Sequence, residues 1–450
     1  MSSKNAIPAA ARPGKSIRRL TAILVGLLLL ICVIAVAPKE WAALVVAVPA
    51  AWSWYLRQNI TPGHGTVIGG FFVVAAAAIA YTGTHLTRTS NARHADRSHN
   101  RADLQELRRR FVTATAQFAN PSPEVRLAGV YALEALTEDW IDRERYTDAQ
   151  TCINYLCGYL VRPYTPPAHS PNLRSSTTRT HHTKYNYTDE THEHPRDDLN
   201  VRRAITRTIA AHLQPDHHHN WSNYDYDLTG AYFHNADFAG SDFNGTTDFS
   251  NAHFYGEKTS FKGVTFRSVH TKFDKANFAC EETTFGRAVF VGDETSFVAT
   301  TFRCSIQASF SGAHFRSTSL TTFSEAQFHG VQTSFNQAHF YSPETSFWAT
   351  QFRSLYTKFD EANFHSKLLT NFAVAGFHSK LASFYFAGFH AGQTVFNRTV
   401  FTGEKTSFVR PRAWKNVSFD WDFPIQYEEP AAQPAYVTPK DWPPAVESKD

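Results

Sequence analysis

The stretch that decides the fold is residues 333–340, which read Thr-Ser-Phe-Asn-Gln-Ala-His-Phe. The same arrangement, T-S-F-x-x-A-x-F, recurs with variations along the second half of the chain. From Phe254 onward the repeat phenylalanines follow each other alternately after five and after seven positions, apart from three steps of eight that end at Phe310, Phe323 and Phe372. The 450 residues include 37 phenylalanines, of which 31 lie between Phe233 and Phe408. A residue type concentrated in this way indicates a repeated structural position.

This spacing excludes a helix of period 3.6 and a simple alternating strand, because neither produces steps of five and seven. A square coil does produce them if each phenylalanine points inward from one side, and one turn then takes about 24 residues. The residue two positions before a phenylalanine is nearly always small, as Thr333 and Ala338 are, which suits a side chain that points inward beside a ring. Turns stacked at roughly 4.8 Å would form columns of rings, with roughly seven turns in a rod on the order of 35 Å long.

We therefore predict a mainly β fold, with a parallel solenoid over residues 228–409. The step of seven residues should bulge two of the four corners outward. The phenylalanines predicted to form the repeat core are Phe233, Phe238, Phe254, Phe261, Phe266, Phe273, Phe278, Phe285, Phe290, Phe297, Phe302, Phe335, Phe340, Phe347, Phe352, Phe359 and Phe364.

The repeats resemble the pentapeptide-repeat family, whose consensus is a small residue, a polar residue, Leu or Phe, and two variable positions. Residues 231–235 (Ala-Tyr-Phe-His-Asn) and 236–240 (Ala-Asp-Phe-Ala-Gly) match that consensus. The resemblance implies a right-handed parallel quadrilateral β-helix. Upstream, Arg110-Phe111 and residues 124–133 resemble a group of membrane-anchored actinobacterial pentapeptide-repeat proteins, a resemblance that implies no assigned activity.

Three apolar stretches near the N-terminus predict a membrane anchor over residues 20–82. Residues 20–37 are uncharged and long enough to cross a bilayer as a helix. Residues 41–56 are shorter and contain a proline, and residues 66–82 form the third stretch. We expect two transmembrane helices, with three as the open alternative, and no cleaved signal peptide. The N-terminal helices would thus have membrane lipid as their partner.

The flanking charges predict the orientation of this anchor. Residues 1–19 contain five basic residues and form a basic tail, and basic residues also follow the third stretch from Arg88 to Arg110. Because basic flanks favour the cytoplasmic side, we expect a multi-pass protein of the cell membrane whose solenoid lies in the cytoplasm.

Residues 83–162 should form a juxtamembrane helix and a small helical region. Ser122-Pro123 is a typical helix start, and a second helical pattern ends before Pro163. Residues 163–198 are predicted to be a polar linker with too few apolar residues for a core, and residues 199–214 a further helix. The tail over 424–450 is rich in proline and is expected to be disordered or loosely draped.

No motif for catalysis or for cofactor binding is present, so we assign no catalytic, cofactor-binding or metal site and expect no enzyme activity. His217, His218 and His219 could bind a metal, but a solvated linker explains them better. The five cysteines include no CxxC pair, which fits a reducing compartment. Cys280 and Cys304 are one turn apart and are expected to lie on the same outer face as two free thiols, with a disulfide as the alternative.

Two functional hypotheses follow. The first is a non-catalytic membrane-anchored scaffold or interaction module with a protein partner. The second, drawn from the resemblance, is a DNA-mimicking regulator of a type II topoisomerase. DNA mimicry requires a strongly acidic surface, whereas residues 228–408 carry 14 acidic and 14 basic side chains. The charge count therefore favours the scaffold, and we expect no nucleic acid as a partner.

Overall fold

The computed structural model describes residues 62–164, 175–183, 186–193, 198–422 and 432–447. The chain divides into two units, residues 1–106 and 107–450, and each is treated by itself below. Helix α3 (Pro62–Gln117) begins in the first unit and includes the apolar stretch 66–82. The stretches 20–37 and 41–56 lie outside the described residues. Across the described part of the chain, we find no helix that is both apolar and long enough to cross a membrane.

The second unit begins with a small helical region made of α4 (Pro123–Asp142), α5 (Tyr146–Leu160) and α6 (Asp198–His212). The expected start of α4 is present, because the side chain of Ser122 accepts a hydrogen bond from the Val125 N–H and Pro123 occupies the first turn. The helices meet through a buried apolar core, to which Leu133, Leu156 and Ile205 contribute fully buried side chains.

A buried ion pair also joins these helices. Arg202 and Asp198 on α6 are both almost completely buried, and Arg202 donates hydrogen bonds to the carbonyl oxygens of Leu160 and Arg162 at 2.8 Å each. These bonds satisfy backbone acceptors left open at the end of α5. The ion pair thus connects the end of one helix to the start of the next.

The segment predicted as a polar linker contains a hairpin of β1 (Ser175–Thr183) and β2 (Asn186–Glu193), which pair antiparallel. Its described side chains are exposed, so it has no core of its own. Arg179 and Asp189 face each other across the strands in a bidentate pair at 2.7 and 2.8 Å. We did not expect a hairpin here, because its stabilising contacts are cross-strand polar pairs, which leave no apolar pattern in the sequence.

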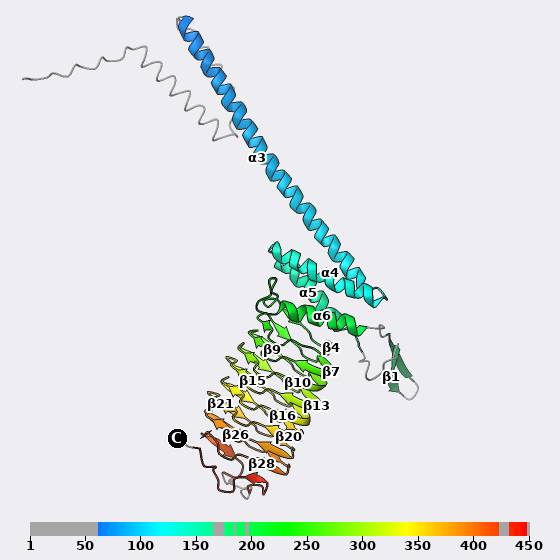
Figure 1. Cartoon of the computed structure of the whole chain (residues 1–450), viewed down its shortest axis with the longest axis vertical. Helices are drawn as coiled ribbons and strands as arrows, with labels where there is room; N and C mark the ends of the chain where they lie inside the picture. The colour runs from blue at the N-terminus through cyan, green and yellow to red at the C-terminus, as the bar shows by residue number, and fades with distance from the viewer. Residues whose placement is uncertain (1–61, 165–174, 184–185, 194–197, 423–431, 448–450) are drawn as a thin grey trace, which may run out of the picture. The chain divides into compact units, whose positions relative to one another are not determined.

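The rest of the unit is a solenoid of parallel strands, which confirms the predicted fold (Figure 1). The first sheet, which covers two sides of the coil, contains β4 (Tyr232–His234), β7 (His253–Ser260), β10 (Asn277–Thr284), β13 (Thr301–Ser309), β16 (Gln327–Ser334), β19 (Gln351–Phe352), β20 (Tyr356–Lys358), β23 (Gly376–Phe377), β24 (Leu381–Ser383), β27 (Val400–Phe401), β28 (Lys405–Ser407) and β31 (Val437–Thr438).

The other two sheets each cover one side of the coil. The second sheet contains β5 (Asp242–Phe243), β8 (Thr265–Phe266), β11 (Val289–Phe290), β14 (His314–Phe315), β17 (His339–Phe340), β21 (Asn363–Phe364), β25 (Gly388–Phe389) and β29 (Ala413–Trp414). The third sheet contains β3 (Tyr226–Asp227), β6 (Thr247–Asp248), β9 (His270–Lys272), β12 (Glu294–Ser296), β15 (Leu320–Thr322), β18 (Glu344–Ser346), β22 (Leu369–Asn371), β26 (Gln393–Phe396) and β30 (Val417–Phe419). The second sheet has one strand per turn, so the coil has about eight turns where we expected about seven.

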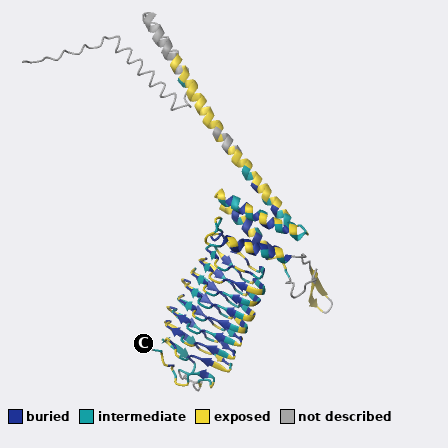
Figure 2. Ribbon diagram, in the orientation of Figure 1, coloured by how far each residue is buried: buried dark blue, intermediate teal, exposed yellow. Residues whose placement is uncertain are grey.

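Four columns of stacked phenylalanine rings fill the interior of the coil. Figure 2 shows the buried residues along the ribbon of every turn. Rings in one column lie nearly parallel, for example Phe254 and Phe278 at 4.4 Å and 3°. Rings of neighbouring columns meet edge to face, as Phe285 and Phe297 do at 5.4 Å and 89°. Every phenylalanine of the predicted repeat core lies in one of these columns and is buried. Such ring contacts add to the free energy gained by burying the apolar area.

The two kinds of corner have different backbones. At the corners with the short step, the residue two positions after the phenylalanine has a positive φ, as at Gln337 (57°) and Val374 (60°). At six of the corners with the long step, the residue two positions after the phenylalanine is a buried serine, and its hydroxyl bonds to a buried threonine of a neighbouring turn. Thr333 and Ser354 are 2.6 Å apart, and Thr321 and Ser342 are 2.7 Å apart. At these corners the long step places a polar side chain inside the corner. We had expected only an outward bulge of the backbone.

Both ends of the coil are covered. At the start, α6 and the loop after it lie over the first turn, where the Asp242 N–H donates to the Leu213 carbonyl oxygen at 2.9 Å. At the end, part of the tail that we expected to be disordered or loosely draped adds β31 to the first sheet. Trp442 then packs over the last rings, 5.0 Å from Phe419. The tail is ordered here because the last turn would otherwise expose its rings.

Candidate functional site: a groove on the solenoid

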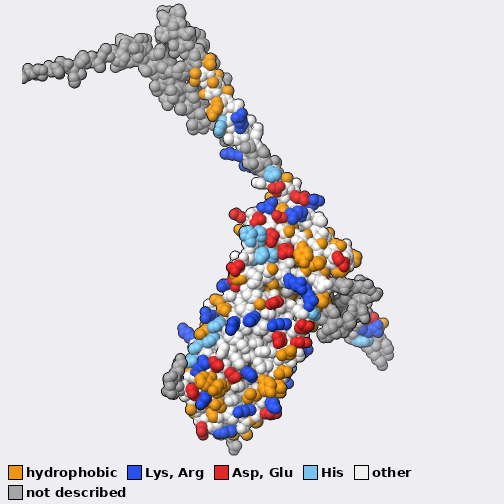
Figure 3. Space-filling view, in the orientation of Figure 1, with side chains coloured by type: hydrophobic (Ala, Val, Ile, Leu, Met, Phe, Trp, Pro, Cys, Tyr) orange, Lys and Arg blue, Asp and Glu red, His pale blue; other side chains and the backbone are white. Residues whose placement is uncertain are grey.

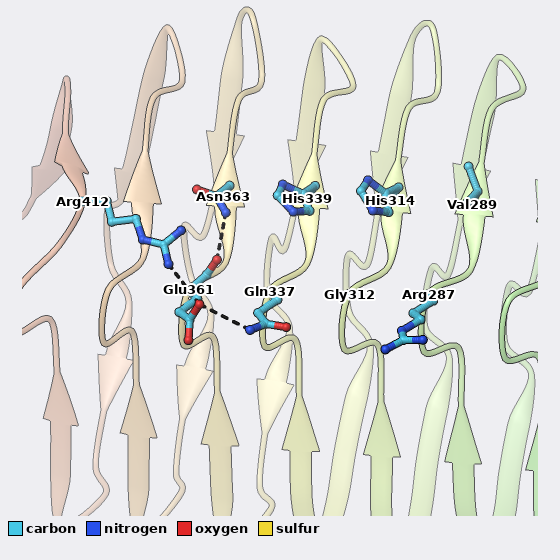
Figure 4. A pocket seen from close by; sticks show the side chains of 9 residues that line it. All are labelled: Arg287, Val289, Gly312, His314, Gln337, His339, Glu361, Asn363 and Arg412. Atoms are coloured by element: carbon cyan, nitrogen blue, oxygen red, sulfur yellow. Dashed lines mark hydrogen bonds and ion pairs between the residues drawn. The ribbon is translucent and has the colours of Figure 1, made fainter. Parts of the chain in front are cut away.

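A groove of about 550 Å³ crosses four successive turns of the solenoid (Figure 4). Two rows of side chains line it, one from the second sheet and one from the short corners beside that sheet. The strand row consists of Val289, His314, His339 and Asn363, each immediately before a core phenylalanine, and the corner row consists of Arg287, Gly312, Gln337 and Glu361. Because every turn repeats the same backbone, side chains from residues about 24 positions apart lie next to each other.

Gly312 opens the middle of the corner row. Its neighbours in the row, Arg287 and Gln337, carry long side chains, whereas Gly312 carries none. Its φ of 67° belongs to the left-handed region, where glycine is the residue with the least strain. Gly312 therefore leaves a gap between two long side chains of the corner row.

Polar contacts hold one end of the groove in place. The Glu361 carboxylate accepts hydrogen bonds from the Arg412 guanidinium at 3.0 Å and from the Gln337 amide at 3.3 Å. The Asn363 side chain donates to the Glu361 carbonyl oxygen at 2.8 Å. Arg412 also lies over the ring of Phe386, 5.5 Å from its centroid. Arg412 thus reaches back across two turns and closes this end of the groove.

Two stacked histidines form the floor. The rings of His314 and His339 lie 4.8 Å apart at an angle of 13°. Burial lowers the pKa of His314, with a smaller contribution from Arg316. Burial likewise lowers the pKa of His339, and the charges of His314, Arg316 and Arg412 add to this effect. Burial and nearby positive charge thus both favour the neutral form of these rings, whereas a nearby anion would favour the protonated form.

The row of rings continues on the same sheet beyond the groove. The Tyr341 ring lies 5.1 Å from that of His365, which lies 4.5 Å from that of His390, and all three are nearly parallel. Arg316 adds a guanidinium 5.6 Å from the centre of the Tyr341 ring. This side of the solenoid is thus a stacked aromatic and imidazole surface with Arg316 beside it.

The sequence did not single out this groove. Each lining residue is unremarkable in its own repeat, and the groove exists only where four turns are aligned. One signal was available: Ala-His-Phe occurs at 313–315 and again at 338–340, with the histidine at the same position of the repeat. Residues at equal positions in successive turns stack, so this recurrence predicts a pair of neighbouring imidazoles.

The structure corrects the expected position of the cysteine pair. Cys280 and Cys304 lie in adjacent turns as free thiols, but both are buried inside a long corner and not on the outer face. Both sulfur atoms contact the hydroxyl of Thr283, at 3.0 and 3.2 Å. The hydrogen bond with Cys280, together with burial, raises the pKa of Cys304. The cysteines occupy the inward position that serines take in later turns.

The histidines after α6 are not simply solvated. His217 and His219 are partly buried, and His219 contacts carboxylates of α4, whereas His218 is exposed. Within the described ranges, no cluster of three or more histidine, cysteine or acidic side chains is arranged to hold a metal ion.

The charge on the solenoid surface is mixed. Acidic and basic side chains are interspersed over the face in view in Figure 3. Such a pattern does not imitate the regular negative charge of a phosphate backbone.

Comparison with known families supports the resemblance. The family model described as Pentapeptide repeats (8 copies) matches residues 227–256, which form the first turn of the solenoid and the start of the second. No curated protein and no solved structure matches the chain. The chain is thus similar to pentapeptide repeats over the first turn of the solenoid, and the later turns repeat the same stacked phenylalanine columns.

Proposed function

We propose that this protein is a non-catalytic, membrane-anchored scaffold that binds an acidic segment of a protein partner in the groove over β11, β14, β17 and β21. The observation that carries the proposal is the charge of the groove. Its lining includes Arg287, Arg412 and two histidines that can be protonated, against the single carboxylate of Glu361.

The rigidity of the solenoid supports a binding role. The groove residues project from strands whose inner faces are packed phenylalanine columns, so their positions change little when a partner binds. Little conformational entropy is then lost on binding. The anchor proposed for residues 20–82 would hold the solenoid at the cytoplasmic side of the membrane, where a partner is met at high local concentration.

An acidic partner fits the groove better than a basic or an uncharged one. The guanidinium of Arg287 forms no ion pair with any described residue, so its planar donors are available to a carboxylate. The pKa of His339 is lowered partly by neighbouring positive charge. A bound carboxylate would oppose that repulsion and favour protonation. Binding should therefore strengthen as the pH falls.

The binding test uses the full-length protein in lipid nanodiscs and a fluorescent peptide of alternating glutamate and alanine. We expect the anisotropy to rise with protein concentration, and the rise to weaken with added salt. The double variant R287E/H339E should bind about tenfold more weakly, the equivalent of about 1.4 kcal/mol. The matched control is R303E, which reverses an exposed arginine on the first sheet and should leave the affinity unchanged within about twofold.

Equal binding of the acidic peptide by R287E/H339E and by the unchanged protein would rule out the groove as its site. Equal binding of a lysine-alanine peptide would rule out the acidic chemistry. The anchor is tested separately by alkaline carbonate extraction of native membranes, from which an anchored protein is not released. Release into the supernatant would remove the anchor from the proposal and leave the groove untouched.

A further inference from the structure

Histidines and carboxylates gather where the helical region meets the start of the solenoid. Figure 3 shows a group of pale blue side chains next to red ones where the helices meet the solenoid. Glu134, Glu138 and Asp142 are spaced four residues apart and so lie along one side of α4. His212, at the end of α6, and His219, in the loop after it, face them.

His212 is buried with both ring nitrogens next to hydrogen-bond acceptors. Only 1% of the residue is exposed. Its Nδ1 lies 2.9 Å from the carbonyl oxygen of Thr208, and its Nε2 lies 3.1 Å from Oε1 of Glu138. A carbonyl oxygen and a carboxylate can only accept, so the ring satisfies both when both nitrogens carry protons. This arrangement fits a positively charged imidazolium, with the Trp221 ring stacked 3.9 Å from it.

His219 has a similar arrangement. Its Nδ1 lies 3.5 Å from the same Oε1 of Glu138, and its Nε2 lies 3.0 Å from Oδ1 of Asp142. Both nitrogens again face carboxylates. Glu138 therefore lies between two imidazole rings, and both rings contact the carboxylate row of α4.

The other charged groups around His212 complete the cluster. Glu134 Oε1 lies 3.8 Å from its Nδ1. The ring of His217 lies 4.1 Å from it, and burial together with the charge of His212 lowers the pKa of His217. The ring of His218 lies beside that of His219 at 4.6 Å. Two imidazoles that face carboxylates and three carboxylates are thus the titratable groups here, beside His217, whose neutral form is favoured.

We propose that this cluster is a proton-dependent latch that holds α4 on the N-terminal cap of the solenoid. The loop that carries His219 belongs to the cap, because Leu213 accepts a backbone bond from Asp242 of the first turns and Trp221 is fully buried. When His212 loses a proton, one of its two acceptors is left facing a lone pair in a buried site, and the latch weakens. The latch is independent of the proposed binding of a partner in the groove.

Hydrogen exchange of the full-length protein, followed by mass spectrometry, tests this latch. The quantity compared is the protection factor of α4 peptides within residues 130–142, corrected for the intrinsic dependence of exchange on pH. We expect this factor to fall about tenfold between about pH 5.5 and about pH 8, since a hydrogen bond between charged groups is lost. The E138Q variant should be less protected at the lower pH and should show no such fall.

D139N is the matched control, because it removes a carboxylate of the same helix that pairs with Arg110 and Arg143 and does not contact the histidines. It should keep the tenfold fall. If E138Q does not fold, H219Q provides the second test, because it removes one of the two imidazoles and should reduce the fall to about threefold. A protection factor that is constant over this pH range in the unchanged protein would overturn the proposal. A fall in E138Q and H219Q as large as that in the unchanged protein would also overturn it.

Discussion

Phe302 and Phe328 stack at 4.7 Å and 1°, although they are separated by two more residues than a regular turn contains. The extra length comes from two eight-residue steps in this turn. One of them is absorbed in β13, where the register to β16 shifts between Cys304 and Gln307. The column of rings stays continuous because displacing a ring would cost more free energy than bulging a corner into solvent. The core therefore sets the register, and the corners adapt to it.

Truncation of a ring in the middle of a column should be strongly destabilising. We expect F302A to lower the free energy of unfolding by about 4 kcal/mol, because it leaves a cavity in the core that neighbouring turns cannot close. Denaturant unfolding followed by circular dichroism measures the change. F386A is the matched control: Phe386 is outside the four columns, and its loss should cost less than about 1 kcal/mol. Equal losses in the two variants would contradict the column as the source of stability.

Relief of backbone strain should stabilise the coil. Val374 has a φ of 60° and is 41% exposed, so it adopts a left-handed conformation that disfavours a branched side chain. Its strain of about 1 to 2 kcal/mol exceeds the entropic cost of a glycine. We expect V374G to raise the free energy of unfolding by roughly 0.5 to 1 kcal/mol. The same substitution at Val395, in strand β26, should lower it by about 1 kcal/mol. A loss of stability in V374G would refute this account of the short corner.

Removal of the C-terminal cap should loosen the last turn. Trp442 packs against Phe408, Trp414 and Phe419 and donates a hydrogen bond to Asp422 at 2.8 Å. We expect W442A to cost about 2 kcal/mol and to speed proteolytic cleavage near residue 432, because β31 loses its support. W348A removes a tryptophan from an exposed corner and should cost less than about 1 kcal/mol. If cleavage were unchanged in W442A, the tail would have no capping role.

Acid should weaken the solenoid. Burial is the main cause of a lowered pKa at the histidines of the first and second sheets, namely His234, His253, His314, His329, His339, His365, His378 and His390. These side chains stay neutral in the folded chain at a pH where they are protonated in the unfolded chain. The unfolded state then binds more protons, so the free energy of unfolding decreases as the pH falls from the unfolded pKa through the folded one.

The urea midpoint should therefore be lower at about pH 5 than at about pH 7.5. In H314Q/H339Q the difference between these two midpoints should be smaller, since two of the titrating groups are gone. Unchanged pH dependence in this double variant would show that the lowered pKa values of these two histidines have no effect on stability. The solenoid thus becomes less stable as the pH falls, whereas the proposed latch at His212 weakens as the pH rises.

The sequence alone was sufficient for the repeat. The period of the phenylalanines follows from the number of residues on each side of the coil, and the small residues two positions earlier follow from the limited space beside a ring. Such a local pattern can be recognised in the sequence because every turn has the same packing requirement. The start of α4 at Ser122 could be predicted for a similar reason, since capping depends on neighbouring residues only.

The tertiary structure decided what depends on contacts between turns and between segments. The groove arises because His314 and His339 occupy the same position in adjacent turns while Gly312 leaves a space between two long side chains. The burial of Cys304 depends on the inward turn of the long corner, and the order of the tail depends on rings that the last turn exposes. These features require contacts between side chains that are distant in sequence. Packing of the whole solenoid determines these contacts, and the sequence of a single repeat does not specify them.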